Sequence, residues 1–273
     1  MPEGPEIRKI ADQLSAVLVG RRLVEAEITL PSLQSAAAMI SGRSVERVTS
    51  RGKALLIEFS GNQTLYSHNQ LYGIWKIVRR GMLPSTNRQL RVALHTREHS
   101  ALLFSATDVS LWKTDELCGH PFLSKLGPDV LDESLTPGEI VSRLQDIRFS
   151  RRGLSSLYLD QGFVAGIGNY LRSEILFDAK LRIDARPHEI VNSSLVRLAK
   201  STLKISRRSY ATGGRTVTKK IASSLAKQEG GFENYRFSVF GRDGKECVVC
   251  DTKIRKTNAN SRRIYWCPRC QLS

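Results

Sequence analysis

Hydrophobic residues in the first 113 positions follow two different periods. Between residues 5 and 19 they recur every three to four positions and predict a helix, with Gly20 as its stop. Residues 22–113 instead hold short β-branched and aromatic runs, separated by Gly, Pro, Asn and Ser. These runs predict strands at residues 23–29, 45–49, 54–59, 64–67, 73–78, 90–95, 101–105 and 109–113. Many short strands at this spacing predict an antiparallel β-sandwich or barrel.

The pattern changes near residue 120. The segment 120–131, "HPFLSKLGPDVL", is punctuated by Pro and Gly and predicts a connector. Residues 136–139 predict a capping box with proline at the first helical position. Helical periodicity follows at residues 137–145, 153–161, 169–178 and 193–207. We therefore expect an α+β multidomain chain that divides into an N-terminal β domain (1–122), a linker (123–135), a helical domain (136–236) and a C-terminal unit (237–273).

The C-terminal unit holds two CxxC sequences, Cys247-x2-Cys250 and Cys267-x2-Cys270, with sixteen residues between them. Two such sequences let four thiolates converge on one zinc ion, at the spacing of a zinc ribbon. A closed shell of four thiolates leaves no position for a substrate water, so we expect one structural Zn²⁺ that helps this small segment fold. Four unrelated cysteines in a reducing cell are the alternative. Cys118 stands apart, and we expect it to be a small buried residue.

The chain is strongly basic, with 42 Lys and Arg against 26 Asp and Glu and a formal net charge of +16. Such a surplus favours polyanionic partners, nucleic acid first and an anionic membrane second, although a basic solvated surface is the alternative. No acidic residue lies between Glu189 and Glu229, and none follows Asp251. We therefore expect the second half to carry the main contact surface for a phosphate backbone.

Nothing in the sequence indicates export or a membrane span. Residues 1–20 contain three acidic residues and no uninterrupted apolar core, which argues against a signal peptide. No apolar run approaches the roughly 20 residues that a membrane-spanning helix needs. We expect a cytoplasmic protein, whose cysteines stay reduced and bind metal rather than form disulfides.

The first residues, "MPEGPE", offer candidate chemistry at the chain terminus. Once Met1 is removed, Pro2 carries a free amine, and an α-amino group titrates near about 7.7–8.0 rather than the roughly 10.4 of lysine. More of it is therefore an unprotonated nucleophile at neutral pH, and its condensation with a sugar aldehyde carbon gives an electron-withdrawing iminium ion. Glu3 would protonate a departing oxygen. Many proteins begin with Met-Pro, so this motif alone assigns no reaction.

Several motifs together resemble the formamidopyrimidine-DNA glycosylase/endonuclease VIII family, on its endonuclease VIII side. They run in the same order from residue 1 to about 271: "MPEGPEI", "RGKALL", "LYSHNQLYG", "HPFLSKLGPDVL", "GIGNYLRSEIL" and "SRRIYWCPRC". The resemblance implies an antiparallel β-sandwich with an opening helix, a helical domain with a helix–two-turns–helix element, and a zinc ribbon. It also implies a basic cleft for damaged double-stranded DNA between two domains. We expect a bacterial, nucleoid-associated monomer that excises oxidised bases, pyrimidines above all, and then cuts the strand by β,δ-elimination.

The resemblance assigns catalytic roles to matching residues. Pro2 matches the Schiff-base nucleophile, and Glu3 matches the general acid that assists opening of the sugar. Lys53 matches a lysine that contacts phosphate and donates a proton in β-elimination. Arg262 matches the zinc-hairpin arginine that grips phosphate and is linked to δ-elimination. Glu6 would support the nucleophile from one helical turn away.

The resemblance also assigns DNA contacts. Asn169 matches the phosphate-binding asparagine of the helix–two-turns–helix element, and Lys125 stands where an arginine phosphate contact is expected. Gln70, Leu71 and Tyr72 would form a wedge that fills the gap left when a lesion is flipped out of the duplex.

Simpler interpretations of these residues stay open. Lys53 would be a solvated lysine between strands, Asn169 a helix cap, and Arg262 one of several diffuse phosphate contacts. Residues 70–72 would be a turn with partly buried apolar side chains.

Two other functions also stay open. An oxidised-purine glycosylase of the same family would use the long segment 211–237 as a loop over the base, yet residues 105–115 lack the Arg-x-Phe wedge of such enzymes. A non-enzymatic zinc-ribbon protein that binds damaged DNA would need none of Pro2, Glu3 and Lys53.

Overall fold

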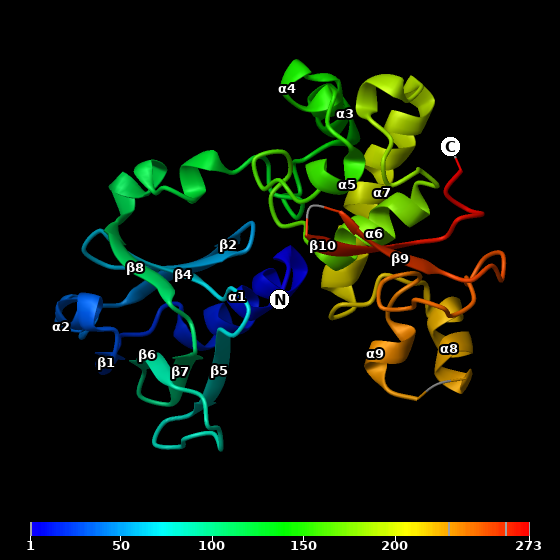
Figure 1. Cartoon of the computed structure of the whole chain (residues 1–273). Coiled ribbons are helices and arrows are strands. Elements are labelled where there is room, and N and C mark those ends of the chain that lie inside the picture. The colour runs from blue at the N-terminus through cyan, green and yellow to red at the C-terminus, as the bar shows by residue number, and fades with distance from the viewer. Residues whose placement is uncertain (1, 229, 260, 273) are drawn as a thin grey trace. The chain divides into compact units, whose positions relative to one another are not determined.

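The computed structural model describes residues 2–228, 230–259 and 261–272 (Figure 1). They form two compact units: the first holds Pro2 and Glu6–Lys125, and the second holds Glu3–Pro5 and the residues from Leu126 onward. Within these ranges, no helix combines the length and apolar character needed to cross a membrane.

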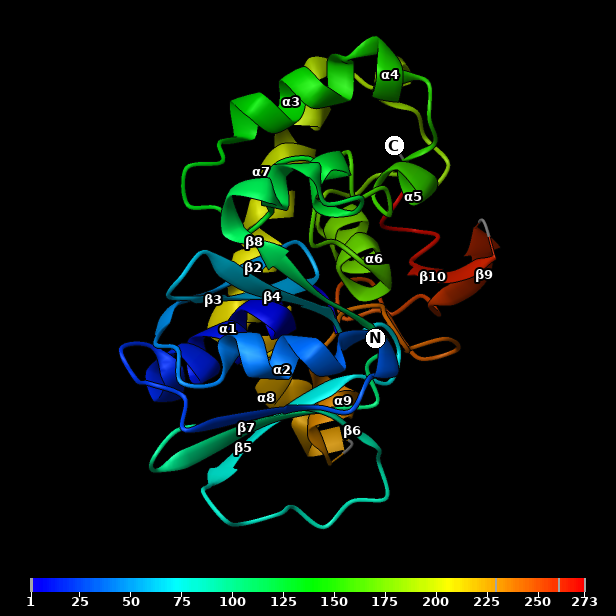
Figure 2. The ribbon, with the colours of Figure 1, turned by 90° about the vertical axis from the view of Figure 1, so that its left-hand side faces the viewer.

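The first unit is a sandwich of two antiparallel sheets, which Figure 2 shows as separate layers. One sheet has the order β2 (Val45–Arg51), β3 (Ala54–Phe59), β4 (Gln63–His68) and β8 (Asp108–Lys113). The other has the order β1 (Glu25–Ile28), β6 (Leu90–His95), β7 (His99–Phe104) and β5 (Ile74–Arg79). The predicted strands match these within two residues at each end, and the predicted β-sandwich is confirmed.

A single core joins the two sheets to the opening helix α1 (Gly4–Leu18). The helix buries an apolar stripe of Ile7, Ala11, Leu14 and Leu18, and Gly20 follows it with a φ of +75°, a conformation that suits glycine at a helix end. A short helix, α2 (Gln34–Ile40), was not predicted, because seven residues with two buried side chains give no clear period.

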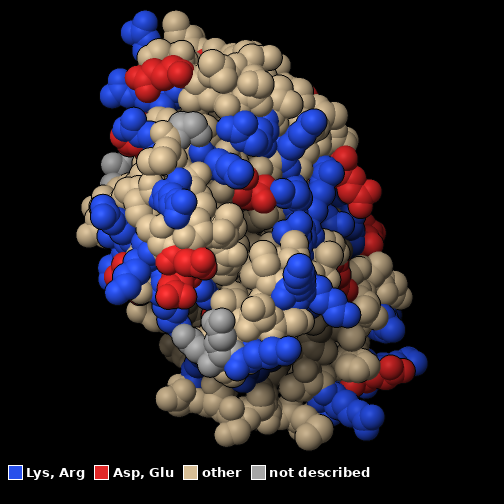
Figure 3. Space-filling view, turned by 90° about the vertical axis from the view of Figure 1, so that its right-hand side faces the viewer, with Lys and Arg blue, Asp and Glu red and all other residues tan. Residues whose placement is uncertain are grey.

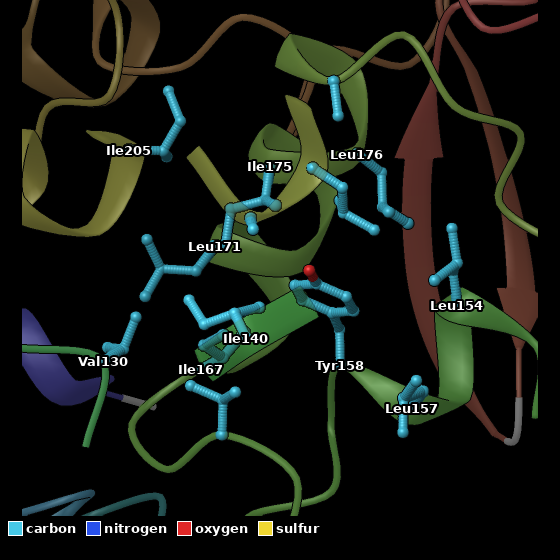
Figure 4. Packing of buried hydrophobic residues seen from close by; sticks show 14 of the residues in the cluster. Val130, Ile140, Leu154, Leu157, Tyr158, Ile167, Leu171, Ile175, Leu176 and Ile205 are labelled. Carbon is cyan, nitrogen blue, oxygen red and sulfur yellow. The ribbon is translucent and has the colours of Figure 1, made fainter. Parts of the chain in front are cut away.

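The second unit is mainly helical. Its helices are α3 (Pro137–Gln145), α4 (Ile147–Ser150), α5 (Leu154–Leu157), α6 (Asn169–Asp178), α7 (Asn192–Ala211), α8 (Lys219–Gln228) and α9 (Phe232–Tyr235). The core gathers around Tyr158, whose hydroxyl shares a 2.8 Å hydrogen bond with Thr202 and whose ring lies among aliphatic side chains (Figure 4). The predicted capping box is confirmed: Thr136 accepts from the Glu139 N–H, and its own N–H donates to the Glu139 carboxylate at 2.8 Å.

Two local predictions are wrong, and two helices of the segment 211–237 were not predicted. The helix expected at 153–161 spans only Leu154–Leu157, because the next N–H groups bond to carbonyls three residues back, Leu159 to Ser156 and Asp160 to Leu157, so that turns replace the helix. The segment 211–237 contains α8 and α9, which the sequence did not indicate, because α8 is rich in Lys and Ser. Cys118 is exposed rather than buried, because its 3-10 helix (Thr114–Gly119) has no face against a core.

The last segment forms a small hairpin of two antiparallel strands, β9 (Arg255–Ala259) and β10 (Arg262–Trp266). A separate apolar cluster packs Tyr265 of this hairpin with Phe177, Val239 and Ile254. The hairpin lies in sequence between the two CxxC pairs, which places one pair before β9 and the other after β10.

Candidate active site and metal centre

The four cysteines of the C-terminal segment meet in one cluster. All four Sγ atoms lie within 4.8 Å of one another, with 3.9 Å between Cys247 and Cys270, 3.5 Å between Cys250 and Cys267, and 3.4 Å between Cys250 and Cys270. A zinc ion bound by four sulfurs at about 2.3 Å holds them roughly 3.8 Å apart in a tetrahedron. The cluster therefore fits one structural Zn²⁺, and four protein ligands leave no position for substrate.

Cys267→Ser is expected to reduce bound zinc from one ion per chain to almost none and to weaken DNA binding, because Cys267 is buried and the β9–β10 hairpin depends on the ion for its fold. Metal analysis and a DNA-binding titration measure both effects. Cys118→Ser is the matched control, because Cys118 is exposed and stands outside the cluster. A Cys267→Ser protein with full zinc and full affinity would contradict the site.

Glu3 is held at the beginning of α6. Its carboxylate oxygens accept hydrogen bonds from the backbone N–H groups of Gly168 at 2.7 Å, Tyr170 at 2.9 Å and Leu171 at 3.2 Å. The side chain is only 4% exposed. The first N–H groups of a helix have no partner within the helix, and the helix dipole favours negative charge there. This position therefore suits an ionised carboxylate.

Glycine is required where the chain passes this carboxylate. A Cβ atom on Gly168 would lie 2.4 Å from the Glu3 carboxyl group, closer than any real contact. Beside it, the Gly4 N–H donates to the Gly166 carbonyl at 2.8 Å, and a Cβ on Gly4 would lie 3.0 Å from Gly166. The "GIG" of the motif at 166–168 thus lets the Glu3 segment approach the helix.

Asn169 is the first residue of α6 and does not cap it. The N-cap residue is Gly168, which has no side chain, and the N–H groups at this end of α6 are bound by the Glu3 carboxylate rather than by Asn169. The Asn169 Oδ1 atom is buried and has no hydrogen-bond partner among the described residues. The interpretation of Asn169 as a simple helix cap is wrong, and the phosphate contact stays a prediction.

Lys53 lies in the tight turn between β2 and β3, where Gly52 adopts a φ of +60°. Its side chain is only 6% exposed, so the interpretation as a solvated lysine is wrong. Burial lowers the pKa of His68; the Asp108 carboxylate opposes this shift, and the Lys53 charge adds to it. Lys53 thus lies within electrostatic range of His68, which pairs with Ala54 across β3 and β4.

The loop after β4 has a fixed backbone. The Gln70 N–H donates to His68 Nδ1 at 3.1 Å, and the Gly73 N–H donates to the Asn69 carbonyl at 2.7 Å. Gln70 itself has a φ of +49°, and its side-chain carbonyl accepts a 2.9 Å hydrogen bond from the Thr107 hydroxyl. These contacts fix the loop at both ends and at its first side chain.

The same loop projects two apolar side chains into solvent. Leu71 is 61% exposed and Tyr72 is 69% exposed, while the Tyr72 carbonyl accepts a hydrogen bond from Arg88 at 2.5 Å. A turn with partly buried apolar residues is therefore the wrong interpretation. A rigid loop with exposed apolar side chains is suited to insertion between bases.

The remaining predicted residues lie at the surface or at the chain start. Arg262 is exposed at the first position of β10, and Lys125 is exposed at the end of a 3-10 helix (Leu123–Lys125). Glu6 is half-buried in the first turn of α1, and Pro2 is half-buried. The predicted removal of Met1 concerns a residue outside the described ranges.

Sequence reasoning missed two residues that connect the predicted ones. His68 links Lys53 to the exposed loop, and Arg172 of α6 faces both Glu3 and Arg262. No sequence signal singled out Arg172, because α6 also holds other polar residues, namely Asn169, Ser173, Glu174 and Asp178.

The basic surface is smaller than the residue count suggests. Figure 3 shows Lys and Arg prevailing on the side where Figure 1 shows α8 and β9. Four basic residues of α7, however, bond within the protein: Arg197 to the Ala179 carbonyl, Lys204 to Asp178, Arg207 to the Leu135 carbonyl and Arg208 to the Thr216 carbonyl. Part of the acid-free stretch therefore stabilises the fold.

Three families match successive parts of the chain: the formamidopyrimidine-DNA glycosylase N-terminal domain at residues 1–108, the formamidopyrimidine-DNA glycosylase H2TH domain at 126–221, and the zinc finger found in FPG and IleRS at 244–272. Curated relatives named Endonuclease 8 match over the full length. Those of Klebsiella pneumoniae and Escherichia coli are 45% identical, and that of Salmonella arizonae is 44% identical, over 99% of this chain and 100% of theirs. The chain belongs to the formamidopyrimidine-DNA glycosylase/endonuclease VIII family.

Solved structures show the same fold. The Lactococcus lactis formamidopyrimidine-DNA glycosylase, non-covalently bound to DNA containing an abasic site, matches with a TM-score of 0.81 at 21% identity, over 99% of this chain and 100% of that one. A complex of that enzyme with DNA containing an oxidised pyrimidine matches with a TM-score of 0.83 at 22% identity, over the whole of both chains.

The family assignment confirms the predicted fold class, with its β-sandwich, helical domain and zinc ribbon. Members of this family are bifunctional DNA glycosylases and abasic-site lyases, so the predicted enzyme class is confirmed. The zinc finger and its four clustered cysteines confirm the predicted structural zinc.

Proposed function

We propose that the protein excises oxidised bases, pyrimidines above all, from double-stranded DNA and then cleaves the abasic site by β,δ-elimination through a Pro2 Schiff base. The observation that carries this proposal is the Glu3 carboxylate, which three N–H groups hold at the beginning of α6 and which follows Pro2 directly in the chain. The full-length similarity to proteins named Endonuclease 8 supports the preference for pyrimidines.

Base removal begins with the secondary amine of Pro2, once Met1 is gone. The amine nitrogen bonds to the sugar carbon that carries the base, and the glycosidic bond breaks as the base leaves with its electron pair. The Glu3 carboxylate takes the proton that the amine nitrogen loses and returns it to the ring oxygen as the carbon–oxygen bond opens. An iminium ion between Pro2 and the sugar remains.

Strand cleavage follows from this iminium ion, which makes the neighbouring sugar C–H bonds acidic. Loss of one proton expels the 3′ phosphate, and a second elimination expels the 5′ phosphate. We assign Lys53 as phosphate contact and proton donor in the first elimination, and Arg262 as the phosphate contact that assists the second. Glu6 supports the amine from the first turn of α1.

The same proposal assigns residues that contact the DNA. Asn169 and Lys125 bind phosphate, while Gln70, Leu71 and Tyr72 enter the duplex where the lesion leaves it. We propose that the protein acts as a monomer. Its functional division is a catalytic domain (1–122), a linker (123–135), a helical domain (136–236) and a zinc ribbon (237–273).

Excision assays on three matched duplexes test the function. One duplex carries an oxidised pyrimidine, one an oxidised purine and one no lesion. The proposal expects excision and strand cleavage that are fastest for the pyrimidine. Faster excision of the purine would favour an oxidised-purine glycosylase, and lesion-dependent binding without cleavage would favour a non-enzymatic binding protein.

Leu71→Ala is expected to slow excision from a paired duplex roughly 10-fold or more while slowing cleavage of a preformed abasic site much less. The Leu71 side chain acts when the base is flipped out of the duplex, a step that costs a few kcal/mol. A preformed abasic site has no base to flip, so loss of the side chain should slow its cleavage less. Single-turnover rates on both substrates measure the difference. Leu83→Ala is the control, because Leu83 is 80% exposed outside the loop. Equal losses on both substrates would indicate a folding defect instead of a wedge.

A further inference from the structure

Helix α6 carries a guanidinium group that solvent does not reach. Arg172 is 0% exposed; its Nη1 donates to the Ser155 carbonyl at 2.6 Å, and its Nη2 donates to the Arg263 carbonyl at 2.9 Å. Its Nε atom has no hydrogen-bond partner in the part of the chain that the structure describes. A buried charge costs free energy unless other charges compensate it, so the surroundings of Arg172 matter.

Two charged groups lie within electrostatic range of this guanidinium: Glu3, which is proposed to act in base removal, and Arg262, which is proposed to act in the second elimination. Burial is the main cause that lowers the pKa of Arg172, Glu3 opposes this shift and Arg262 adds to it, and together they leave the pKa at about 10. Glu3 is the compensating negative charge, and its carboxylate is bound to the N–H groups of Tyr170 and Leu171, directly before Arg172 in the same helix.

Strand β10 is fixed to α6 by neighbouring contacts. The Arg263 carbonyl accepts from Arg172, and the Tyr265 N–H donates to the Ser173 hydroxyl at 3.3 Å. Arg262 directly precedes Arg263 and begins the strand. The guanidinium of Arg172 therefore bonds to the backbone directly next to Arg262 and is one of the contacts that hold β10.

We propose that Arg172 is a positioning residue for both halves of the reaction: its charge keeps Glu3 ionised, and its hydrogen bonds hold the strand that presents Arg262. This inference rests on the proposed function, because it concerns the roles given there to Glu3 and Arg262. Arg172 itself touches neither base nor sugar in this scheme, and acts only through the other two residues.

The two roles predict different defects. A nearby positive charge favours the ionised form of a carboxylate, so loss of the charge makes Glu3 bind its proton at higher pH. Because Glu3 must be ionised to take the proton of the amine, the acid limb of the pH profile for base excision moves to higher pH. Loss of the hydrogen bonds instead loosens β10, which lowers the share of δ-elimination product relative to β-elimination product.

Two variants separate these roles. Arg172→Gln removes the charge and keeps an N–H donor, and it is expected to move the acid limb by roughly one pH unit or more. Arg172→Lys keeps the charge and loses the two-pronged geometry, so it is expected to leave the acid limb in place and lower the δ-product share several-fold. The assays are the pH dependence of single-turnover excision and the product ratio on a preformed abasic site, with zinc content as the measure of folding.

Arg143 provides matched controls. Its Nε and Nη2 donate to the carbonyls of Phe163 and Gly162 at 2.8 and 2.6 Å, and burial lowers its pKa too, but the charges near it are Arg148, Asp146 and Asp160. Arg143→Gln and Arg143→Lys are expected to change neither the acid limb nor the product ratio.

The outcomes distinguish this inference from the proposed function. If the wild-type protein is active, two results overturn the inference alone. One is an acid limb that does not shift in Arg172→Gln, and the other is an equal shift in Arg143→Gln. An unchanged product ratio in a folded Arg172→Lys protein overturns the strand-holding role. A wild-type protein that excises neither kind of base overturns the proposed function, and the inference with it.

Discussion

A protein that keeps one extra residue before Pro2 is expected to lose both covalent trapping and base excision while it still binds DNA. The proline nitrogen inside a peptide bond is an amide, whose lone pair is delocalised into the carbonyl group and no longer attacks carbon. The proposed phosphate contacts involve other residues, so DNA binding should be unaffected. We therefore expect complete loss of covalent trapping and base excision, with little change in the affinity for DNA.

The measurement is reduction by borohydride in the presence of abasic DNA, which converts an iminium ion into a stable protein–DNA adduct. Peptide mapping of the adduct is expected to find it on Pro2. Enzymatic removal of the extra residue from the same preparation is the control, and it should restore trapping. An adduct on Lys53, or full activity of the extended protein, would show that Pro2 is not the nucleophile.

The β-sandwich was predictable because its strands are bounded by local signals. The strands β3 and β6 were predicted to the residue, since each is an apolar run that begins and ends at polar or glycine-containing turns. Helix α8 escaped prediction because few of its side chains are buried, Ala222 and Leu225 among them, within a sequence of Lys, Ser and Ala. Periodicity identifies a helix only when one face is clearly apolar.

The site was predictable only in part, for a different reason. The zinc cluster follows from the spacing of four cysteines, because two short CxxC loops and one hairpin bring the sulfurs together locally. The contact of Glu3 with Gly168 joins residues 165 positions apart, and no local pattern announces it. Arg172 looks like an ordinary helix-surface arginine in sequence, because its complete burial results from packing around α6.

Glu3→Gln is expected to slow base removal by about 10²–10⁴-fold, the usual contribution of a positioned acid–base group. Glutamine occupies the same volume, but it neither takes the proton of the amine nor returns one to the ring oxygen. Its amide NH₂ also faces the N–H groups of α6 as a donor against donors, so the side chain loses part of its anchorage. Cleavage of a preformed abasic site should fall far less, because the base has already left.

The same assays on Glu139→Gln show whether such a loss is specific. Glu139 is also a carboxylate at a helix start in the second unit, where Thr136 donates to it through both backbone and side chain and lowers its pKa. Its replacement weakens a capping box and touches no proposed reaction step, so both rates should stay close to those of the wild-type protein. If Glu3→Gln slowed excision and abasic-site cleavage equally, Glu3 would act by holding its segment against α6, and the proton transfer would have to be assigned to another group.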